Sequence, residues 1–122
     1  MSYPHGDLVL VIDCADLDRA AGFWCAVLGL QPSGPAPGAH LHLRPVDGAG
    51  VPVLLQRVPE RKKGKNRLHL DLRVPDLDAE VARVVAAGAT LLTEEPVVEA
   101  GSGRHVLADP DGNEFCVVQP GT

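Results

Sequence analysis

Polar side chains with catalytic potential alternate with aliphatic ones along residues 67–74. His69 and Asp71 are two positions apart, so in a β-strand both side chains leave the same face. A carboxylate beside an imidazole can fix the tautomer of the ring for general-base chemistry, or it can make a static hydrogen bond. This polar face is either solvated or lines a binding cavity, and we expect the cavity, with Arg73 near its rim.

The opposite face of the same predicted strand is entirely aliphatic. Alternation with period two predicts one face turned towards a hydrophobic layer and one turned away from it. We therefore expect this face to pack against helices. Its members are Leu68, Leu70, Leu72 and Val74.

A second polar face is predicted on strand 40–44, where His42 and Arg44 alternate with leucines. It is either an exposed strand or the other side of the same cavity, with the Arg44 guanidinium able to bind an anionic or polar ligand. Gln56 interrupts the aliphatic strand predicted at 51–58, which makes it a candidate ligand contact. Trp24 is either a core residue or a surface for stacking a ligand.

Length and composition indicate one globular domain. The chain has 122 residues, of which 45% are hydrophobic, and a net charge of -5. The acidic balance argues against a nucleic-acid partner, and the absence of a long apolar run argues against a membrane span. The first residues show no basic and then apolar pattern of a secretory signal. Three cysteines without close spacing favour reduced thiols and a cytoplasmic location.

Two similar halves follow one another in the chain. The tripeptides at 16–18 and 76–78 are both Asp-Leu-Asp, 60 positions apart, and each opens a predicted helix after a predicted strand. Asp16 and Asp76 are expected N-caps, and Gly29 and Gly88 are expected helix stops. Because about 60 residues make a marginal core, we expect the two halves to share a sheet and to enclose a cleft.

Residues 16–29 and 108–115 carry a family likeness. The first reads D-x-x-R-x-x-x-F-W-x-x-x-L-G, and the second contains D-P-D-G-N. Together they resemble the vicinal oxygen chelate superfamily of glyoxalases, bleomycin and fosfomycin resistance proteins and extradiol dioxygenases, and more narrowly small bacterial glyoxalase-like domains. The resemblance implies an α+β domain over 1–122, with βαβββ modules at about 5–60 and 65–120. A curved mixed sheet would surround a cleft, with helices outside.

The resemblance also implies where a metal would be held. The four equivalent positions fall on Val9, Gln56, His69 and Cys116. The second becomes Leu55 if the prolines after the last strands, rather than the 60-residue offset, are aligned. One imidazole, one thiol and one neutral amide are a poor ligand set. We therefore expect no metal cofactor, with zinc, nickel or manganese as the alternative.

The sequence favours a small-molecule-binding glyoxalase-like protein with a sequestration or carrier role. The alternative is a lyase or isomerase of the glyoxalase type, dependent on a metal or on His69 as acid and base, so whether the protein is an enzyme stays open. Cys116 is expected to be a buried small hydrophobe rather than a nucleophile. The partners that we expect are a small-molecule ligand and, from the resemblance, a second copy. The expected ligand-binding residues are His69, Asp71, Gln56, His42, Arg44, Arg73 and Trp24.

Overall fold

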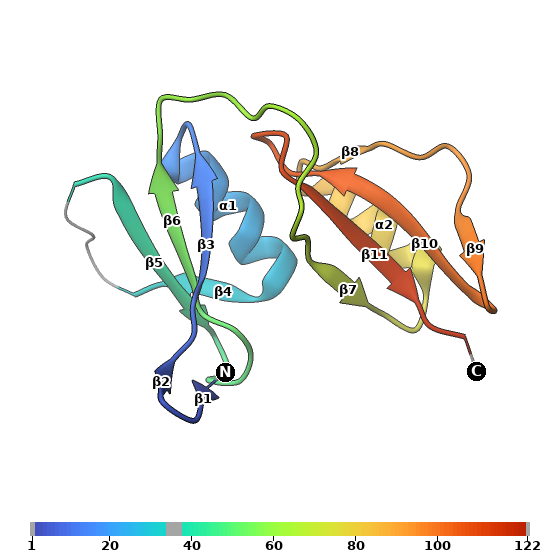
Figure 1. Ribbon diagram of the computed structural model, residues 1–122, viewed down its shortest axis with the longest axis horizontal. Helices are drawn as coiled ribbons and strands as arrows, with labels where there is room; N and C mark the ends of the chain where they lie inside the picture. Colours follow the sequence, from blue (N-terminus) through green and yellow to red (C-terminus); the bar gives the residue numbers. More distant parts are fainter. Residues whose placement is uncertain (1, 34–37, 122) are drawn as a thin grey trace. The chain divides into compact units, whose positions relative to one another are not determined.

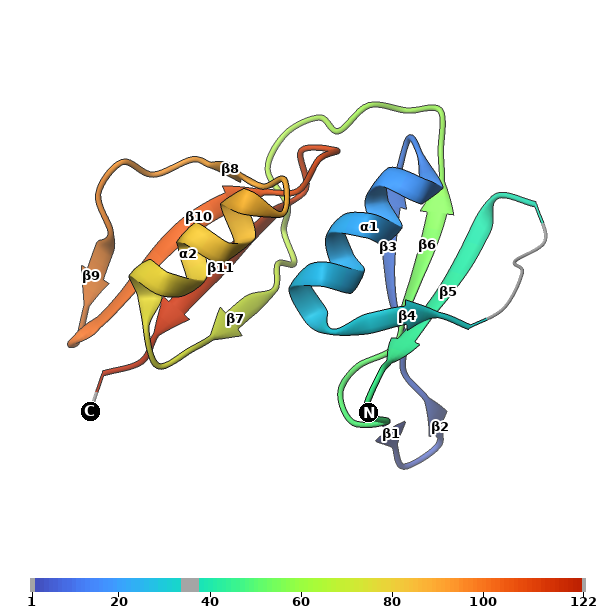
Figure 2. The ribbon, with the colours of Figure 1, turned by 180° about the vertical axis from the view of Figure 1, so that it is seen from behind.

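The structure is a computed structural model that describes residues 2–33 and 38–121. The chain folds into two compact units, Met1–Arg61 and Lys62–Thr122. The modules expected at about 5–60 and 65–120 fall within them. Figures 1 and 2 show that each unit packs one helix against one sheet. The predicted α+β class is confirmed.

The sheet of the first unit has the order β3-β6-β5-β4. Strands β3 and β6 are parallel, and the other pairs are antiparallel. A short β1–β2 hairpin, which the sequence did not predict, precedes this sheet. The elements are β1 (Ser2–Tyr3), β2 (Gly6–Asp7), β3 (Leu10–Cys14), α1 (Leu17–Leu28), β4 (Leu30–Pro32), β5 (His40–Pro45) and β6 (Val53–Arg57).

Helix α1 begins and ends where its capping residues predict. The Asp16 carboxylate accepts a hydrogen bond from the Arg19 N–H at 3.1 Å, which satisfies a backbone donor that the helix leaves unpaired. Gly29 has φ +66°, a left-handed conformation that costs glycine little, and its N–H donates to the Cys25 carbonyl. Phe23 and Trp24 are buried on one side of α1 in an edge-to-face contact, with ring centroids 4.9 Å apart. The helix therefore packs its aromatic face against β4, β5 and β6.

The sheet of the second unit has the order β7-β11-β10-β8, with β9 also paired to β10. Strands β7 and β11 are parallel, so this unit repeats the topology of the first. Strand β9 occupies part of the segment 94–103, for which the sequence allows a loop or a weak hairpin. The elements are β7 (Asp71–Arg73), α2 (Leu77–Ala86), β8 (Thr90–Leu91), β9 (Val97–Glu99), β10 (Ser102–Ala108) and β11 (Glu114–Gln119).

Helix α2 covers the aliphatic face of this second sheet. Asp76 caps it by accepting from the Ala79 N–H at 3.1 Å, in the same geometry as the first helix. A buried histidine also lies in this unit: His105 is 6% exposed, and its Nδ1 lies 2.8 Å from Thr93 Oγ1. Such a pairing satisfies a polar group in the core. The buried hydrophobic side chains of the unit are Leu77, Val84, Ala89, Leu107, Ala108, Phe115, Cys116 and Val117.

The predicted strand at 67–74 is wrong over its first half. Only Asp71–Arg73 forms β7, and Leu68 is 92% exposed instead of packing against a helix. Pairing with β11 starts where the Leu70 carbonyl accepts from the Cys116 N–H at 2.8 Å. Leu68 lies before this point, so alternation in the sequence cannot hold its side chain against the core. Leu70, Leu72 and Val74 are only partly buried.

The first strand is displaced from its predicted position. The apolar run 8–12 predicts a strand there, but β3 is Leu10–Cys14, and its pairing with β6 begins at Leu10 and Val53. Val9 and Val11 are 41% and 51% exposed because they point away from the helix-covered side. Residues 8–12 are all aliphatic, so their sequence could not indicate which face of the strand the helix would cover.

The interpretation of Asp109-Pro110-Asp111-Gly112-Asn113 as a turn is confirmed. Asp109 is 3% exposed, and one carboxylate oxygen accepts from the N–H groups of Asp111 and Asn113 at 2.9 and 2.8 Å. Its other oxygen accepts from the Asn113 side-chain amide at 3.0 Å. The buried Asp109 carboxylate therefore stabilises the turn that connects β10 to β11.

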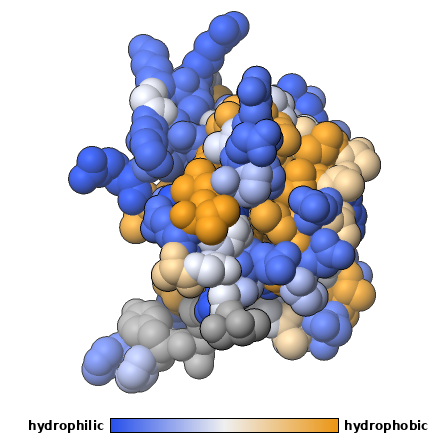
Figure 3. All heavy atoms as spheres, turned by 90° about the vertical axis from the view of Figure 1, so that its right-hand side faces the viewer, coloured by the Kyte–Doolittle hydropathy of each residue, from blue (hydrophilic) through white to orange (hydrophobic). Residues whose placement is uncertain are grey.

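The surface is mixed in polarity. The space-filling view in Figure 3 shows hydrophobic residues side by side with hydrophilic ones over one face. The second unit exposes large hydrophobic side chains on α2 and along β8 and β9. They are Val85 on α2, Leu91 on β8, Leu92 just after β8 and Val98 on β9. Within the described residues, neither helix combines the length and the hydropathy that crossing a lipid bilayer requires.

Candidate functional site

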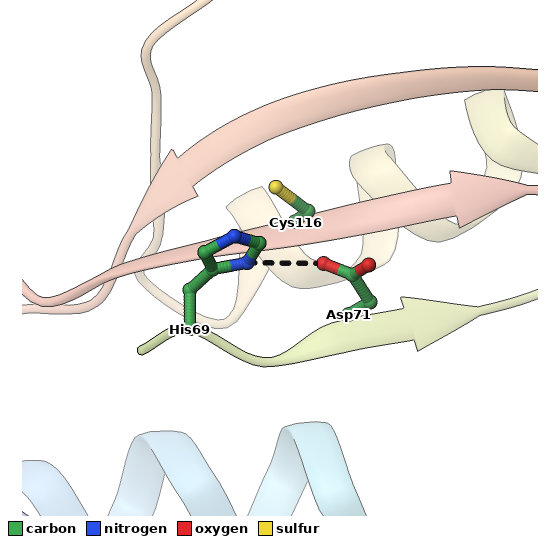
Figure 4. A group of neighbouring side chains, drawn as sticks. All are labelled: His69, Asp71 and Cys116. Carbon is green, nitrogen blue, oxygen red and sulfur yellow. Dashed lines mark hydrogen bonds and ion pairs between the residues drawn. The ribbon is translucent and has the colours of Figure 1, made fainter. Parts of the chain in front are cut away.

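Three potential ligand side chains converge on the second unit. His69, Asp71 and Cys116 each offer one donor atom, and these three atoms all lie within 4.8 Å of one another. The His69 Nδ1 is 3.2 Å from Asp71 Oδ1, as the dashed line in Figure 4 shows. The His69 and Asp71 side chains are 44% and 48% exposed, whereas Cys116 is 6% exposed. We call these three residues the triad centre.

Strand pairing brings the triad centre together. Asp71 on β7 is the parallel partner of Cys116 on β11, so their side chains leave the same face of the sheet. That face is the one opposite α2, because Phe115 and Val117 share the other face of β11 with Gln119, whose side-chain oxygen accepts from the Leu77 N–H at the start of α2 at 2.9 Å. The predicted pairing of His69 with Asp71, and the proximity of Cys116 to His69, are both present.

The segment before His69 is tied to the start of β11. The Asn66 N–H donates to a Glu114 carboxylate oxygen at 3.0 Å, and its side-chain amide donates to the Glu114 carbonyl at 3.1 Å. Lys62 pairs with the same carboxylate at 3.1 Å. The backbone hydrogen bond from Asn66 and the side-chain bond from Lys62 hold the pKa of Glu114 below its usual value. These contacts position the chain on which His69 sits.

The Cys116 thiol is held in its protonated form. Burial raises its pKa, and the negative charge of Asp71 and a hydrogen bond to that carboxylate raise it further, against the opposing charges of Arg104 and Lys65. A thiolate is the reactive form of cysteine. At neutral pH the side chain therefore acts as a small buried group, as the sequence predicts.

Alkylation of Cys116 should be slow at neutral pH and should accelerate only above the usual titration range of a thiol. Replacing Asp71 with asparagine removes the charge that disfavours the thiolate, so the Asp71→Asn variant should alkylate faster at pH 8, with its profile moved to lower pH. Iodoacetamide labelling, followed by mass spectrometry of the Cys116 peptide, measures both profiles. The Cys25 peptide is the internal control, since burial alone raises the pKa of that thiol. Identical Cys116 profiles in the two proteins would contradict the assignment.

Other predicted ligand residues lie on the first unit. His40 on β5 is the partner of Gln56 on β6, so Gln56 shares the open sheet face with His42 and Arg44. His42 and Arg44 are exposed, and Gln56 is half-buried. They form a polar surface of that unit, and their part in ligand binding stays a prediction.

Of the two remaining predicted ligand residues, Trp24 is buried and Arg73 is exposed. Trp24 is 1% exposed in the core of the first unit, so the predicted ligand contact through its indole is replaced by a packing role. The ring is enclosed because α1 turns its aromatic face towards the sheet. Arg73 is exposed at the end of β7, and its place at the rim of a binding cavity stays a prediction.

The strand register corrects the assignment of Gln56 to a metal position. Asp71 pairs with Cys116 in the second unit, and the residue 60 positions before Asp71, Val11, pairs with Leu54 in the first. Leu54 is thus the counterpart of Cys116, rather than Gln56 or Leu55. Equivalent residues of the two halves are 60 positions apart at the helices. This spacing changes at the last strand, because the segments between the helix and the last strand differ in length in the two halves.

Asp71 is a potential metal ligand that the sequence-based set of Val9, Gln56, His69 and Cys116 did not contain. Its position two residues after His69 was the available signal, since alternation places both side chains on one face. With Asp71, the second unit alone supplies an imidazole, a carboxylate and a thiol. Val9 and Val11, the counterparts of His69 and Asp71 in the first unit, carry no ligand atom.

Comparison with known proteins agrees with this topology. The glyoxalase-like domain family matches residues 9–118. Proteins named "Putative glyoxylase CFP32" from Mycobacterium bovis and Mycobacterium tuberculosis are 30% identical over 103 residues. The match covers 84% of this chain but only 40% of those proteins, so the chain spans well under half of their length.

Solved structures share the fold at low sequence identity. A glyoxalase/bleomycin resistance protein/dioxygenase family enzyme from Burkholderia phytofirmans has a TM-score of 0.72 at 21% identity, covering 91% of this chain and 95% of its own. The fosfomycin resistance protein FosX from Listeria monocytogenes, complexed with Mn(II) and 1S,2S-dihydroxypropylphosphonic acid, has a TM-score of 0.75 at 16% identity, covering 98% and 93%. These structures share the fold, and the family model that spans residues 9–118 shows that the chain belongs to the glyoxalase-like domain family.

Proposed function

We propose that the protein binds a small polar molecule at the triad centre, in a sequestration or carrier role. The observation that carries the proposal is the convergence of His69, Asp71 and Cys116 on the open sheet face of the second unit. His69 and Asp71 are half-exposed there, so their remaining donor and acceptor atoms are available to a ligand. A few polar groups that converge from neighbouring strands are a common feature of ligand sites.

The ligand class is a compact molecule with both hydrogen-bond donors and acceptors. Asp71 accepts hydrogen bonds, and the His69 nitrogen that does not face Asp71 can donate or accept according to its tautomer. The structurally similar proteins include one that holds a phosphonic acid, which motivates phosphonates and other small acids as part of a screen. A cytoplasmic location and a homodimer, expected from the sequence and the family resemblance, belong to the same proposal.

Thermal-shift screening of metabolites and antibiotics tests the proposal on protein treated with EDTA and on protein supplied with zinc. A ligand present at 100 times its Kd should stabilise the folded state by about 2.7 kcal/mol and raise Tm measurably. The His69→Ala variant should lose this rise, whereas His5→Ala, which changes a histidine in an exposed turn of the first unit, should keep it. A broad screen without a hit, or hits that His69→Ala leaves intact, would refute binding at the triad centre.

A second candidate is a lyase or isomerase of the glyoxalase type. It is favoured by the contact between His69 Nδ1 and Asp71 Oδ1, because an imidazole oriented by a carboxylate can exchange a proton at its other nitrogen. Turnover of a hemithioacetal substrate that disappears in His69→Ala would support this candidate. Ligand binding without turnover would favour the carrier role.

A further inference from the structure

Two arginines leave the same face of the second sheet, on either side of one valine. Arg73 on β7 is the parallel partner of Val118 on β11, and Val118 is the antiparallel partner of Arg104 on β10. Paired residues of neighbouring strands point to the same side of a sheet. The three residues therefore form one row across β7, β11 and β10, which lie side by side in Figures 1 and 2. Val118 is two positions after Cys116, so this row is on the open sheet face with the triad centre.

The spacing of the two arginines suits one anion between them. Neighbouring strands are about 4.8 Å apart, so the Cα atoms of Arg73 and Arg104, two strands apart, are separated by roughly 10 Å. Two guanidiniums that each donate parallel N–H···O bonds of about 2.8 Å to one oxyanion stand on opposite sides of it, roughly 8 Å apart. Side chains that leave the sheet almost perpendicular to it need only a small lean towards Val118. Val118 is half-buried and offers an aliphatic floor below the anion.

The two guanidiniums differ in their partners. Within residues 2–33 and 38–121, the Arg73 side chain makes no hydrogen bond or ion pair. Arg104 Nη2 lies 3.3 Å from Glu99 Oε1, and the two side chains are 36% and 66% exposed. Burial raises the pKa of the Cys116 thiol, and the charge of Arg104 is close enough to oppose that rise. The open sheet face therefore carries one uncompensated positive charge and a second one that an exposed carboxylate holds.

Glu99 takes the place of a competing anion at Arg104. It lies on β9 opposite Ser102 of β10, so alternation puts its side chain on the same face as its diagonal neighbour Arg104. An exposed ion pair of this kind contributes little to stability, because water screens both charges. An oxyanion that receives parallel hydrogen bonds from both arginines makes stronger contacts than this single pair. Rotation of the Arg104 side chain from Glu99 towards Val118 would complete the site without moving a strand.

We propose that Arg73 and Arg104 form an oxyanion site over Val118, and that Glu99 pairs with Arg104 until the ligand displaces it. The ligand group is a tetrahedral oxyanion with three or more terminal oxygens, because one bidentate guanidinium already uses both oxygens of a carboxylate. The proposal rests on the proposed function, since it names the charged end of the molecule that the triad centre would bind. The other end of that molecule carries a hydrogen-bond donor for Asp71, which is two residues or about 7 Å along β7 from Arg73.

Titration with inorganic phosphate at low ionic strength tests the site without any assay of activity. The Nε–H resonances of Arg73 and Arg104, followed by NMR, should shift along one saturable curve, and acetate should bind about 10-fold more weakly or less. Because hydrogen bonds to charged groups are strong, Arg73→Gln and Arg104→Gln should each weaken phosphate binding by about 10-fold or more. Arg57→Gln changes an exposed arginine at the end of β6 and should keep the affinity.

Glu99→Gln tests the competing carboxylate. Removal of this charge should tighten phosphate binding by about 2–5-fold, which corresponds to the strength of an exposed ion pair. The matched control is Glu80→Gln, because Glu80 pairs with the single guanidinium of Arg83 at 2.7 Å on α2, and its loss should leave the affinity unchanged. No saturable shift of either arginine, equal binding of acetate and phosphate, or an unchanged affinity in Glu99→Gln would each overturn the proposal.

Structural effects of the substitutions are separated from loss of the site by thermal unfolding. None of the side chains of Arg73, Arg104 and Glu99 is buried, so all three glutamine variants should unfold at nearly the Tm of the parent protein in the absence of phosphate. Weaker phosphate binding at an unchanged Tm would then support a direct contact with the anion.

Failure of this proposal differs from failure of the proposed function. Phosphate contacts only the arginines, so His69→Ala should retain its binding. Compounds that raise Tm through His69, together with no phosphate binding, leave the binding function standing and refute the oxyanion site. Phosphate binding that depends on Arg73 and Arg104, with no compound that raises Tm through His69, refutes the binding function and leaves the oxyanion site.

Discussion

Replacing Trp24 with alanine should lower the free energy of unfolding by about 3–5 kcal/mol. The indole is 1% exposed and packs edge-to-face against Phe23, so its removal opens a cavity that rigid neighbours cannot fill. Urea denaturation followed by circular dichroism measures the change.

Trp24→Phe should retain most of the stability, because a smaller ring keeps part of the packing. Val46→Ala, which shortens a side chain 62% exposed, is the control and should change the free energy of unfolding by less than about 0.5 kcal/mol. If Trp24 instead stacked on a ligand, Trp24→Ala would preserve stability and abolish the ligand-induced rise in Tm. That outcome would restore the ligand-stacking role that the sequence alone allows for this residue.

Replacing Asp109 with alanine should destabilise the protein by about 2–4 kcal/mol. The carboxylate is 3% exposed and accepts from two backbone N–H groups and the Asn113 amide, which would lose their acceptor together. Guanidinium denaturation, with the midpoint and the slope both fitted, measures the loss.

The matched control is Asp47→Ala, which removes the same kind of carboxylate hydrogen bond from an exposed turn. The Asp47 carboxylate accepts from the Ala49 N–H at 2.9 Å in an exposed turn, so its loss should cost less than about 1 kcal/mol. Equal destabilisation by both variants would show that burial of Asp109 is not what makes its turn important. Asp109→Asn, which keeps one acceptor oxygen, should fall between the alanine variant and the parent protein.

The helices were predictable because their signals are local. Asp16 and Gly29 bound α1 through contacts with residues three or four positions away, and the hydrophobic period falls between them. Strand β7 was not predictable to the same extent, because its length depends on how far β11 runs beside it. Leu68 has the residue type of a core position but precedes the stretch that pairs with β11, and pattern alone cannot report that.

The sequence could predict which residues of the second unit belong to the candidate site. It could not predict which residues of the first unit occupy the equivalent positions. His69 and Cys116 were located through the family resemblance, and the contact of His69 with Asp71 follows from alternation. The residue of the first unit that is equivalent to Cys116 depends on strand register. The second unit has extra residues between its helix and its last strand, so the equivalent residue is Leu54 instead of Gln56. Sequence offsets are preserved across a helix but not across loops of variable length, so register is a tertiary property.

The parallel pairing of β7 with β11 also has a kinetic consequence. These strands lie at opposite ends of the second half of the chain, so the triad centre forms only after the intervening helix and strands have brought the two ends together. Such non-local closure is slow relative to helix formation. A molecule or ion bound at the triad centre would bridge the first and last strands of that unit. We therefore expect occupancy to reduce the unfolding rate more than it increases the folding rate.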